Sequence, residues 1–264
     1  MDMPALITLL SDFGACDPFV GVMKGVIKGI HPAADIIDLT HGIEPQNLTM
    51  GGMAWQMSTP YFPPGTIHVG VVDPGVGTTR RAIAARAEDA FFICPDNGLI
   101  TFIARERSID RIVVLENPMY QLPSPSRTFH GRDIFAPAAA HLAAGVDLDE
   151  LGPTIDDYVR LIPTEPAIRR DFVIAHVVYF DTFGNAYTDL VEPRFADWGA
   201  SRFTMTVNGT VIDKISQAYA DVERGRPVAI FASHGRLEIA VRNGSARSAL
   251  GLALGDEVRF DRHD

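Results

Sequence analysis

The order of apolar and polar positions divides the first half of the chain into strand-like and helix-like segments. Short apolar runs predict strands at residues 5–10, 35–39, 66–72 and 111–115, with two more between residues 82 and 94. Apolar residues at helical spacing predict helices at residues 17–30, 47–58, 99–105 and 133–144. In the first helix, Asp17 is the expected N-cap and Pro18 the first helical residue. Strands that alternate with helices are typical of a mostly parallel sheet with helices on both faces.

The pattern changes near residue 171 to strand-like runs that are separated by turns. These runs cover residues 172–180, 186–191, 203–207, 228–231, 237–241 and 257–260. Asn208 and Gly209, between two apolar segments, are a strong signal for a β-hairpin. We therefore predict an α/β fold with an N-terminal domain over residues 1–165 and a smaller all-β domain over residues 166–264.

Composition limits the partners that the protein can have. The chain of 264 residues has 47% hydrophobic and 21% charged residues, which is typical of a globular protein, and its formal net charge is -10. Proteins that bind nucleic acid use Lys and Arg to neutralise phosphates, so no nucleic-acid partner is expected. A neutral or cationic small molecule fits this charge better.

Two local features bear on the environment of the protein. Cys16 and Cys94 are too few for a thiolate zinc site or a disulfide scaffold, and each lies among apolar residues, so we predict two reduced core thiols. Residues 1–4 have no basic segment and lead into a short strand-like run, which predicts neither a secretory signal nor a membrane span. The cytoplasm is the default expectation.

The first candidate for chemistry is a carboxylate that precedes a glycine-rich turn. Asp73 follows a buried strand, so its side chain should emerge at the carboxyl end of the sheet, where ligands of open α/β sheets bind. Arg80 follows the turn, and His130 lies in another loop segment. The three side chains together can hold one reactive water. By itself Asp-Pro-Gly is an ordinary turn, and the glycines match neither the dinucleotide nor the P-loop fingerprint.

Two aspartates near the start of the chain are candidates for ligand binding. Asp12 comes directly after the first strand, at the same expected sheet edge as Asp73, and can accept both hydroxyls of a ribose. The alternative is a loop or capping residue. Asp17 can cap its helix and can also meet a ligand ammonium group.

Four residues of the C-terminal part are open to a structural or a binding role. Phe183 can stack on a base and Asn185 can pair with its polar edge, although their segment reads equally well as a connecting turn. Ser233 and Arg242 stand at the ends of predicted strands and have the same two interpretations.

Five motifs read in order resemble the S-adenosylmethionine hydroxide adenosyltransferase family, also called S-adenosyl-L-methionine hydrolases, which is related to the fluorinases and chlorinases. The resemblance covers nearly the whole chain. The motifs are residues 11–14 (Ser-Asp-Phe-Gly), 72–77 (Val-Asp-Pro-Gly-Val-Gly) with Arg80, 95–99 (Pro-Asp-Asn-Gly-Leu), 129–133 (Phe-His-Gly-Arg-Asp) and 183–185 (Phe-Gly-Asn).

The resemblance implies an activity and an assembly. The activity is hydrolysis of S-adenosyl-L-methionine to adenosine and L-methionine, with no metal and no cofactor besides this substrate. The assembly is a homotrimer of subunits that each have a barrel-like C-terminal domain, with the substrate between neighbouring subunits. In position, Asp73, Arg80 and His130 match the residues that activate water in the family, and Asp12 matches its ribose-binding aspartate.

The remaining substrate-binding residues are also assigned by the resemblance. Asp17 stands where the methionine amino group is held, Phe183 and Asn185 where adenine lies, and Ser233 near the methionine carboxylate. Arg242 completes the predicted substrate-binding set. His234 stands where the halogenase relatives have an arginine.

The substrate's own chemistry suits the three predicted catalytic residues. A sulfonium is already a good leaving group, so the ribose 5′ carbon needs an aligned nucleophile more than an acid. Arg80 would stabilise developing hydroxide, while His130 and Asp73 orient the water and accept its proton.

Two alternatives remain open. A halogenase needs a small neutral pocket for its halide, whereas Asp73, Arg80 and His130 are polar, and residues 81–92 are too short for the insertion seen in fluorinases. The other alternative is a sensor that binds adenosine or S-adenosylmethionine without turnover. A pure binder has no need of residues that hold a water, which argues against it.

Overall fold

The computed structural model describes residues 5–263 and divides into two compact units between Leu161 and Ile162. This division lies shortly before the predicted one at residues 163–166. Residues 1–4, on which the expectation about a signal segment depends, lie outside the described part. No described helix is long and apolar enough to cross a membrane.

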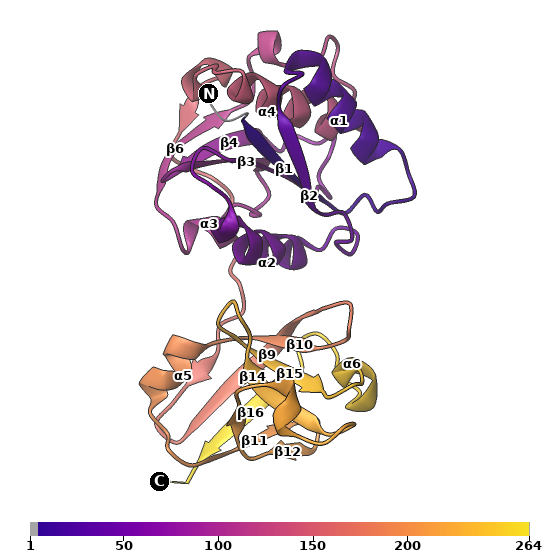
Figure 1. Cartoon of the computed structure of the whole chain (residues 1–264). Coiled ribbons are helices and arrows are strands. Elements are labelled where there is room, and N and C mark those ends of the chain that lie inside the picture. The colour runs from indigo at the N-terminus through magenta and orange to yellow at the C-terminus, as the bar shows by residue number, and fades with distance from the viewer. Residues whose placement is uncertain (1–4, 264) are drawn as a thin grey trace. The chain divides into compact units, whose positions relative to one another are not determined.

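The first unit is a seven-stranded sheet with helices on both faces (Figure 1). Its four strands on one side are parallel, and β4 pairs antiparallel with β5 and β6. The reversal has a local cause, because only Glu88 and Asp89 connect β4 to β5, and so short a link joins antiparallel strands only. The predicted mostly parallel sheet is confirmed. The strand order is β2 (Asp35–Thr40), β1 (Leu6–Ser11), β3 (Ile67–Val71), β5 (Ala90–Pro95), β4 (Ala82–Ala87), β6 (Ile109–Val114) and β7 (Thr154–Ile155).

Two helices cover each face of this sheet (Figure 1). Helices α1 (Phe19–Ile30) and α4 (Ala136–Ala143) enclose one apolar core with the sheet. Helices α2 (Leu48–Ser58) and α3 (Thr101–Ala104) enclose a second core on the opposite face, around Trp55 and Phe92. All four predicted helices are present, and the two cores fix the sheet edge that carries the polar loops.

Two local predictions in the first unit are wrong. Pro18, not Asp17, is the N-cap of α1, because the Pro18 carbonyl already accepts the first helical hydrogen bond from Val22 at 2.9 Å. Cys16 is exposed because it lies in the open turn before α1, whereas Cys94 is buried as expected. Burial raises the pKa of the Cys94 thiol.

The helix predicted from residue 133 begins earlier and irregularly. Residues Gly131–Phe135 form a π-helical turn, η3, which continues directly into α4. His130 is the N-cap of η3. Turns of this kind are rare and are often found at functional sites.

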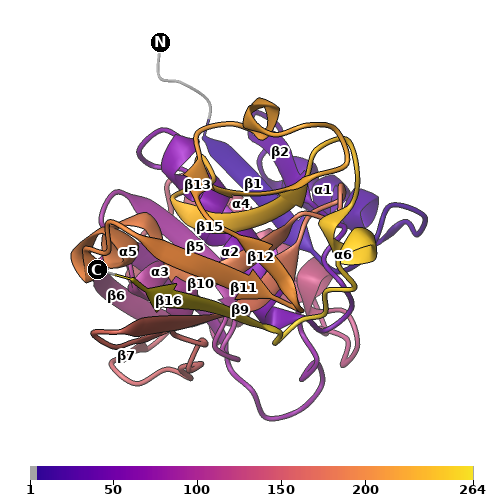
Figure 2. The same cartoon turned by 90° about the horizontal axis from the view of Figure 1, so that it is seen from below.

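The second unit is a curled sheet of nine strands around an apolar interior (Figure 1 and Figure 2). The expected barrel-like sheet is confirmed, and so is the hairpin, in which Asn208 and Gly209 both have positive φ, 44° and 76°. Two short helices, α5 (Glu192–Trp198) and α6 (Ala246–Ala249), were not predicted. The strands are β8 (Ala167–Ile168), β9 (Phe172–Phe180), β10 (Ala186–Val191), β11 (Phe203–Val207), β12 (Thr210–Ile212), β13 (Ile215–Ser216), β14 (Pro227–Phe231), β15 (Arg236–Val241) and β16 (Glu257–Arg262).

Candidate active site

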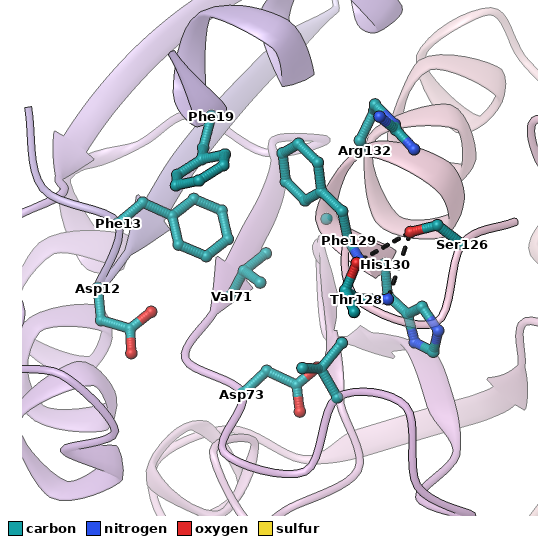
Figure 3. Close-up of a pocket in the computed structure, with 12 residues that line it drawn as sticks. Asp12, Phe13, Phe19, Val71, Asp73, Ser126, Thr128, Phe129, His130 and Arg132 are labelled. Carbon is teal, nitrogen blue, oxygen red and sulfur yellow. Dashed lines mark hydrogen bonds between the residues drawn. The ribbon is translucent and has the colours of Figure 1, made fainter. Parts of the chain in front are cut away.

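A cavity of about 490 Å³ lies at the carboxyl ends of β1 and β3 (Figure 3). These two strands are parallel neighbours whose last residues, Ser11 and Val71, stand opposite each other. The loops that follow therefore deliver Asp12 and Asp73 to the same edge of the sheet. His130 reaches the cavity from the N-terminus of η3.

Asp73, Arg80 and His130 are in direct contact. Arg80 Nε donates to both carboxylate oxygens of Asp73, at 2.9 and 3.0 Å, and Arg80 Nη2 forms a further bond to Asp73 Oδ2. The same Nη2 lies 2.7 Å from His130 Nδ1. The side chains of Arg80 and Asp73 are only 9% and 6% exposed. These charge-assisted hydrogen bonds hold the guanidinium of Arg80 in one position.

The local fold explains how Arg80 returns to Asp73 within seven residues. The chain turns at Gly77, where φ is +80° and any side chain would collide with the carbonyl of Arg127. Thr78 Oγ1 donates to the Gly75 carbonyl at 2.7 Å and closes the turn. Position 77 therefore requires glycine for two reasons: its φ is positive, and the Arg127 carbonyl leaves no room for a Cβ atom.

The electrostatics define the state of His130. Burial lowers its pKa, and the positive charge of Arg80 lowers it further, so the ring is neutral at pH 7. Arginine can only donate, so His130 Nδ1 accepts the bond from Arg80 and the ring proton lies on Nε2. The Ser126 carbonyl accepts from this ring proton, so a bound water shares the Nε2 donor with it, while the carboxylate of Asp73 still has lone pairs that can accept a proton.

The Asp12 side chain has one hydrogen-bond partner in the described part of the chain. Its Oδ2 accepts a hydrogen bond of 2.8 Å from the backbone N–H of Gln46, directly before the N-cap of α2. Its carboxylate lies at the same end of the cavity as Asp73 (Figure 3). Asp17 is exposed and does not line this cavity.

Three aromatic rings form the other end of the cavity, and their meeting was not predicted (Figure 3). Phe13, Phe19 and Phe129 contact one another edge to face, with ring centroids 5.4 to 5.9 Å apart. Phe19 is 43% exposed although it begins a helix whose inner face is apolar. The only sequence signal for this cluster is that Phe13 and Phe129 stand next to predicted site residues.

The motif at residues 95–99 stabilises the loop that carries Asp73. Asp96 is buried, pairs with Arg81 at 2.7 Å and accepts from the Val159 N–H at 2.8 Å. Asn97 donates to the Val72 carbonyl at 2.8 Å, just before Asp73. This motif therefore has a structural role in holding the loop after β3.

The predicted binding residues of the second unit differ in exposure and in hydrogen bonding. Phe183 is 77% exposed, whereas Asn185 is buried and donates to Asp181 Oδ2 at 3.0 Å. Arg242 Nη1 donates to the carbonyls of Val222 and Ala220, at 2.6 and 3.1 Å. Ser233 is exposed.

These four residues do not gather at one point of the second unit. The turn that carries Phe183 and Asn185 leads into β10, and Ala186 pairs with Ile239 toward the end of β15, near Arg242. Ser233 precedes the start of β15, at its opposite end.

The cavity, with Asp12, Asp73 and His130 in its lining, belongs to an α/β unit that is followed by a barrel-like unit, which is the architecture of a two-domain small-molecule enzyme. Family models for the N-terminal and C-terminal domains of SAM hydroxide adenosyltransferase match residues 7–152 and 175–259. The chain belongs to this family.

Individual relatives extend over nearly the same length. A protein of Thermus thermophilus named (R)-S-adenosyl-L-methionine hydrolase is 40% identical, covering 96% of this chain and 98% of its own. One of the same name from Methanocaldococcus jannaschii is 31% identical, with 98% and 97% covered. A fluorinase of Nocardia brasiliensis is more distant, at 26% identity with 96% of each covered. An uncharacterized conserved protein from Thermotoga maritima has the same fold, with a TM-score of 0.91, 38% identity, and 97% and 100% covered.

Proposed function

We propose that this protein hydrolyses S-adenosyl-L-methionine to adenosine and L-methionine. A water or hydroxide attacks the ribose 5′ carbon, a C–O bond forms, and the C–S bond breaks with its electron pair going to sulfur. The observation that carries this proposal is that Asp73 and His130 line one end of the cavity and are both bonded to Arg80. Family membership and the names of the full-length relatives support it.

Each of the three residues has a separate role in preparing the nucleophile. Free water has a pKa of about 15.7, so a nearby positive charge is needed to stabilise hydroxide, and Arg80 supplies it. His130 positions the water oxygen through its Nε2 proton. Asp73 accepts the proton that the water loses, because its carboxylate has open lone pairs and the His130 Nδ1 lone pair is already occupied by Arg80.

The rest of the cavity suits an adenosyl sulfonium. Asp12 binds the ribose hydroxyls, and the Phe13, Phe19 and Phe129 rings face the sulfonium, whose positive charge is attracted to aromatic faces. The products adenosine and methionine lack this cation. The aromatic end therefore favours binding of the substrate over retention of its products.

The other substrate contacts are part of the same proposal. Asp17 binds the methionine ammonium group and Ser233 its carboxylate, while Phe183 and Asn185 contact adenine, and the resemblance to the family supports these roles. Arg242 is a further substrate-binding residue, proposed from its place at the end of a strand. A homotrimer with sites between neighbouring subunits, which the resemblance supports, and a cytoplasmic location belong to the proposal too.

The test is chromatography of the purified protein after incubation with each sulfonium epimer of S-adenosylmethionine in ¹⁸O-water. We expect equal amounts of adenosine and methionine, with the label in the 5′ hydroxyl of adenosine. Arg80→Ala, treated identically, is the control for contaminating activity. Intact substrate would favour a sensor, and 5′-chloro-5′-deoxyadenosine formed in chloride would favour a halogenase.

A further inference from the structure

A line of polar side chains connects helix α1 with the loop that carries Asp12. Lys24 Nζ on α1 lies 2.6 Å from Asp38 Oδ2 on β2. Asp38 Oδ1 lies 3.1 Å from His41 Nε2, just after β2. His41 Nδ1 in turn lies 2.7 Å from the hydroxyl of Ser11, the last residue of β1.

This line holds the chain on both sides of Asp12. Ser11 comes directly before Asp12, is buried, and its Oγ also accepts from the Phe13 N–H at 3.3 Å. The Gly14 N–H donates to the His41 carbonyl at 2.8 Å. His41 therefore contacts the loop through its ring and through its backbone.

The hydrogen-bond roles follow from the atoms present. Ser11 Oγ accepts from Phe13, so its hydroxyl proton is free to point at His41 Nδ1, and the ring proton of a neutral His41 is on Nε2, facing Asp38. The His41 Nε2 contact with Asp38 is electrostatic, since Nε2 has no aligned acceptor. Burial raises the pKa of Asp38, but its contacts with Lys24 and His41 lower it more, so the carboxylate is charged at neutral pH.

We propose that His41 is a positioning residue that fixes the Asp12 carboxylate for recognition of the ribose hydroxyls. Within residues 5–263 the Gln46 N–H is the one hydrogen-bond partner of the Asp12 side chain, so its direction depends on the backbone that Ser11 and His41 hold. Holding the loop in its bound form before the ligand arrives removes an ordering cost from binding. This inference rests on the proposed function, in which Asp12 binds the ribose.

The experiment compares two ligands that differ only at the ribose. Dissociation constants of adenosine and 2′,3′-dideoxyadenosine are measured by calorimetry for the wild type and for His41→Ala. We expect adenosine binding to weaken about tenfold in the variant, as for loss of a hydrogen bond to a charged group, and dideoxyadenosine binding to change less than twofold. A merely structural role would weaken both ligands alike.

Further variants make the result specific. His41→Asn keeps a polar atom near the place of Nδ1 and should restore most of the adenosine affinity, and Ser11→Ala should reproduce the loss. His31→Ala, in the same unit but outside this line, should leave both ligands unchanged. If His41→Ala fails to fold, Ser11→Ala carries the comparison, because it removes only one hydroxyl.

Three results would overturn the inference, and they have different meanings for the proposed function. Equal losses for the two ligands, or unchanged adenosine binding in Ser11→Ala, would refute positioning by His41 and leave hydrolysis intact. A wild type that binds the two ligands equally well would refute the ribose role of Asp12, on which the inference rests. Hydrolysis itself is decided separately by the product analysis.

Discussion

The two units differ in how their candidate site residues are hydrogen-bonded. One set lies at the cavity of the first unit, and the other lies at strand ends of the second unit. Asp73 and His130 line a cavity, and both are bonded to Arg80. Asn185 and Arg242 are bonded to their own unit, to the Asp181 carboxylate and to backbone carbonyls. The first set is arranged for chemistry, whereas the second set has a complete structural explanation and reaches a ligand only by the family resemblance.

The largest effect that would sharpen this contrast is expected at Arg80. Arg80→Ala removes the charge that stabilises hydroxide, so kcat should fall roughly 100- to 1,000-fold while the affinity for substrate changes little. Initial rates of adenosine formation and calorimetry give the two quantities.

The matched control is the adjacent Arg81→Ala. Arg81 pairs with Asp96 and Asp157, whereas Arg80 is bonded to the cavity residues Asp73 and His130, so the Arg81 variant should lose stability and keep kcat within a few fold. Equal losses of kcat in the two variants would remove the distinction between a catalytic and a structural arginine.

A smaller effect is expected at Asp12. Asp12→Ala removes a charged acceptor, which is worth about 1.5–3 kcal/mol, so affinity should fall roughly 10- to 150-fold with kcat at saturation unchanged. Titration of binding together with saturation kinetics checks this. A fall in kcat at unchanged affinity would contradict the ribose role.

In the second unit, substitutions of Phe183 and Arg242 test whether each residue binds the ligand or only stabilises the fold. Phe183→Ala should change the free energy of unfolding by no more than about 0.5 kcal/mol, because the ring is exposed, and yet weaken substrate binding. Arg242→Met should cost about 1–3 kcal/mol of stability by leaving two carbonyls without a donor. Urea unfolding and calorimetry measure both variants. Unchanged affinity in Phe183→Ala would make the second unit's turn purely structural.

The smallest effect is a pH dependence of stability with opposite signs in the two units. Burial first, and then Arg80, lower the pKa of His130 from 6.5, so its contribution is complete above pH 6.5 and is lost as pH falls through its pKa in the folded state. Burial raises the pKa of Glu238 in β15 from 4.5, so its contribution is complete below pH 4.5 and is lost as pH rises.

The two tryptophans report on the units separately. Trp55 lies in the first unit and Trp198 in the second, and both are buried, so a Trp→Phe change at either one leaves the other as the fluorescent reporter. The contribution of each group is the difference in the free energy of unfolding between the parent protein and its His130→Gln or Glu238→Gln variant, measured over a range of pH. Differences with the same pH slope in both units would refute the assignment of these shifts.

Most of the fold could be predicted because the spacing of apolar residues indicates which side chains are buried. The runs that became β1, β3 and β9 are continuous or alternating apolar segments, and the sheet buries them. The short helices α5 and α6 escaped prediction because seven and four residues carry too little periodicity. Cys16 shows that this rule can fail. Its neighbours in the sequence are apolar, but the turn that carries it is exposed.

The site was predictable where its residues are close in sequence. Asp73 and Arg80 meet across one turn, whereas His130 is 50 residues beyond Arg80 and was joined to them through the order of motifs. Nothing local indicates that Phe19 packs against Phe129, or that His41 reaches Ser11, because both contacts join different elements of the fold. Such contacts follow from the three-dimensional arrangement alone.

The π-helical turn that begins at Gly131 makes the number of residues after His130 as important as their identity. Each residue of a helix accounts for roughly 100° of rotation and 1.5 Å of rise. A deletion of one residue in η3 that restored an ordinary helix would swing the imidazole away from Arg80 while every active-site side chain was still encoded. We therefore expect a one-residue deletion between positions 130 and 136 to abolish turnover while Asp73, Arg80 and His130 are all retained.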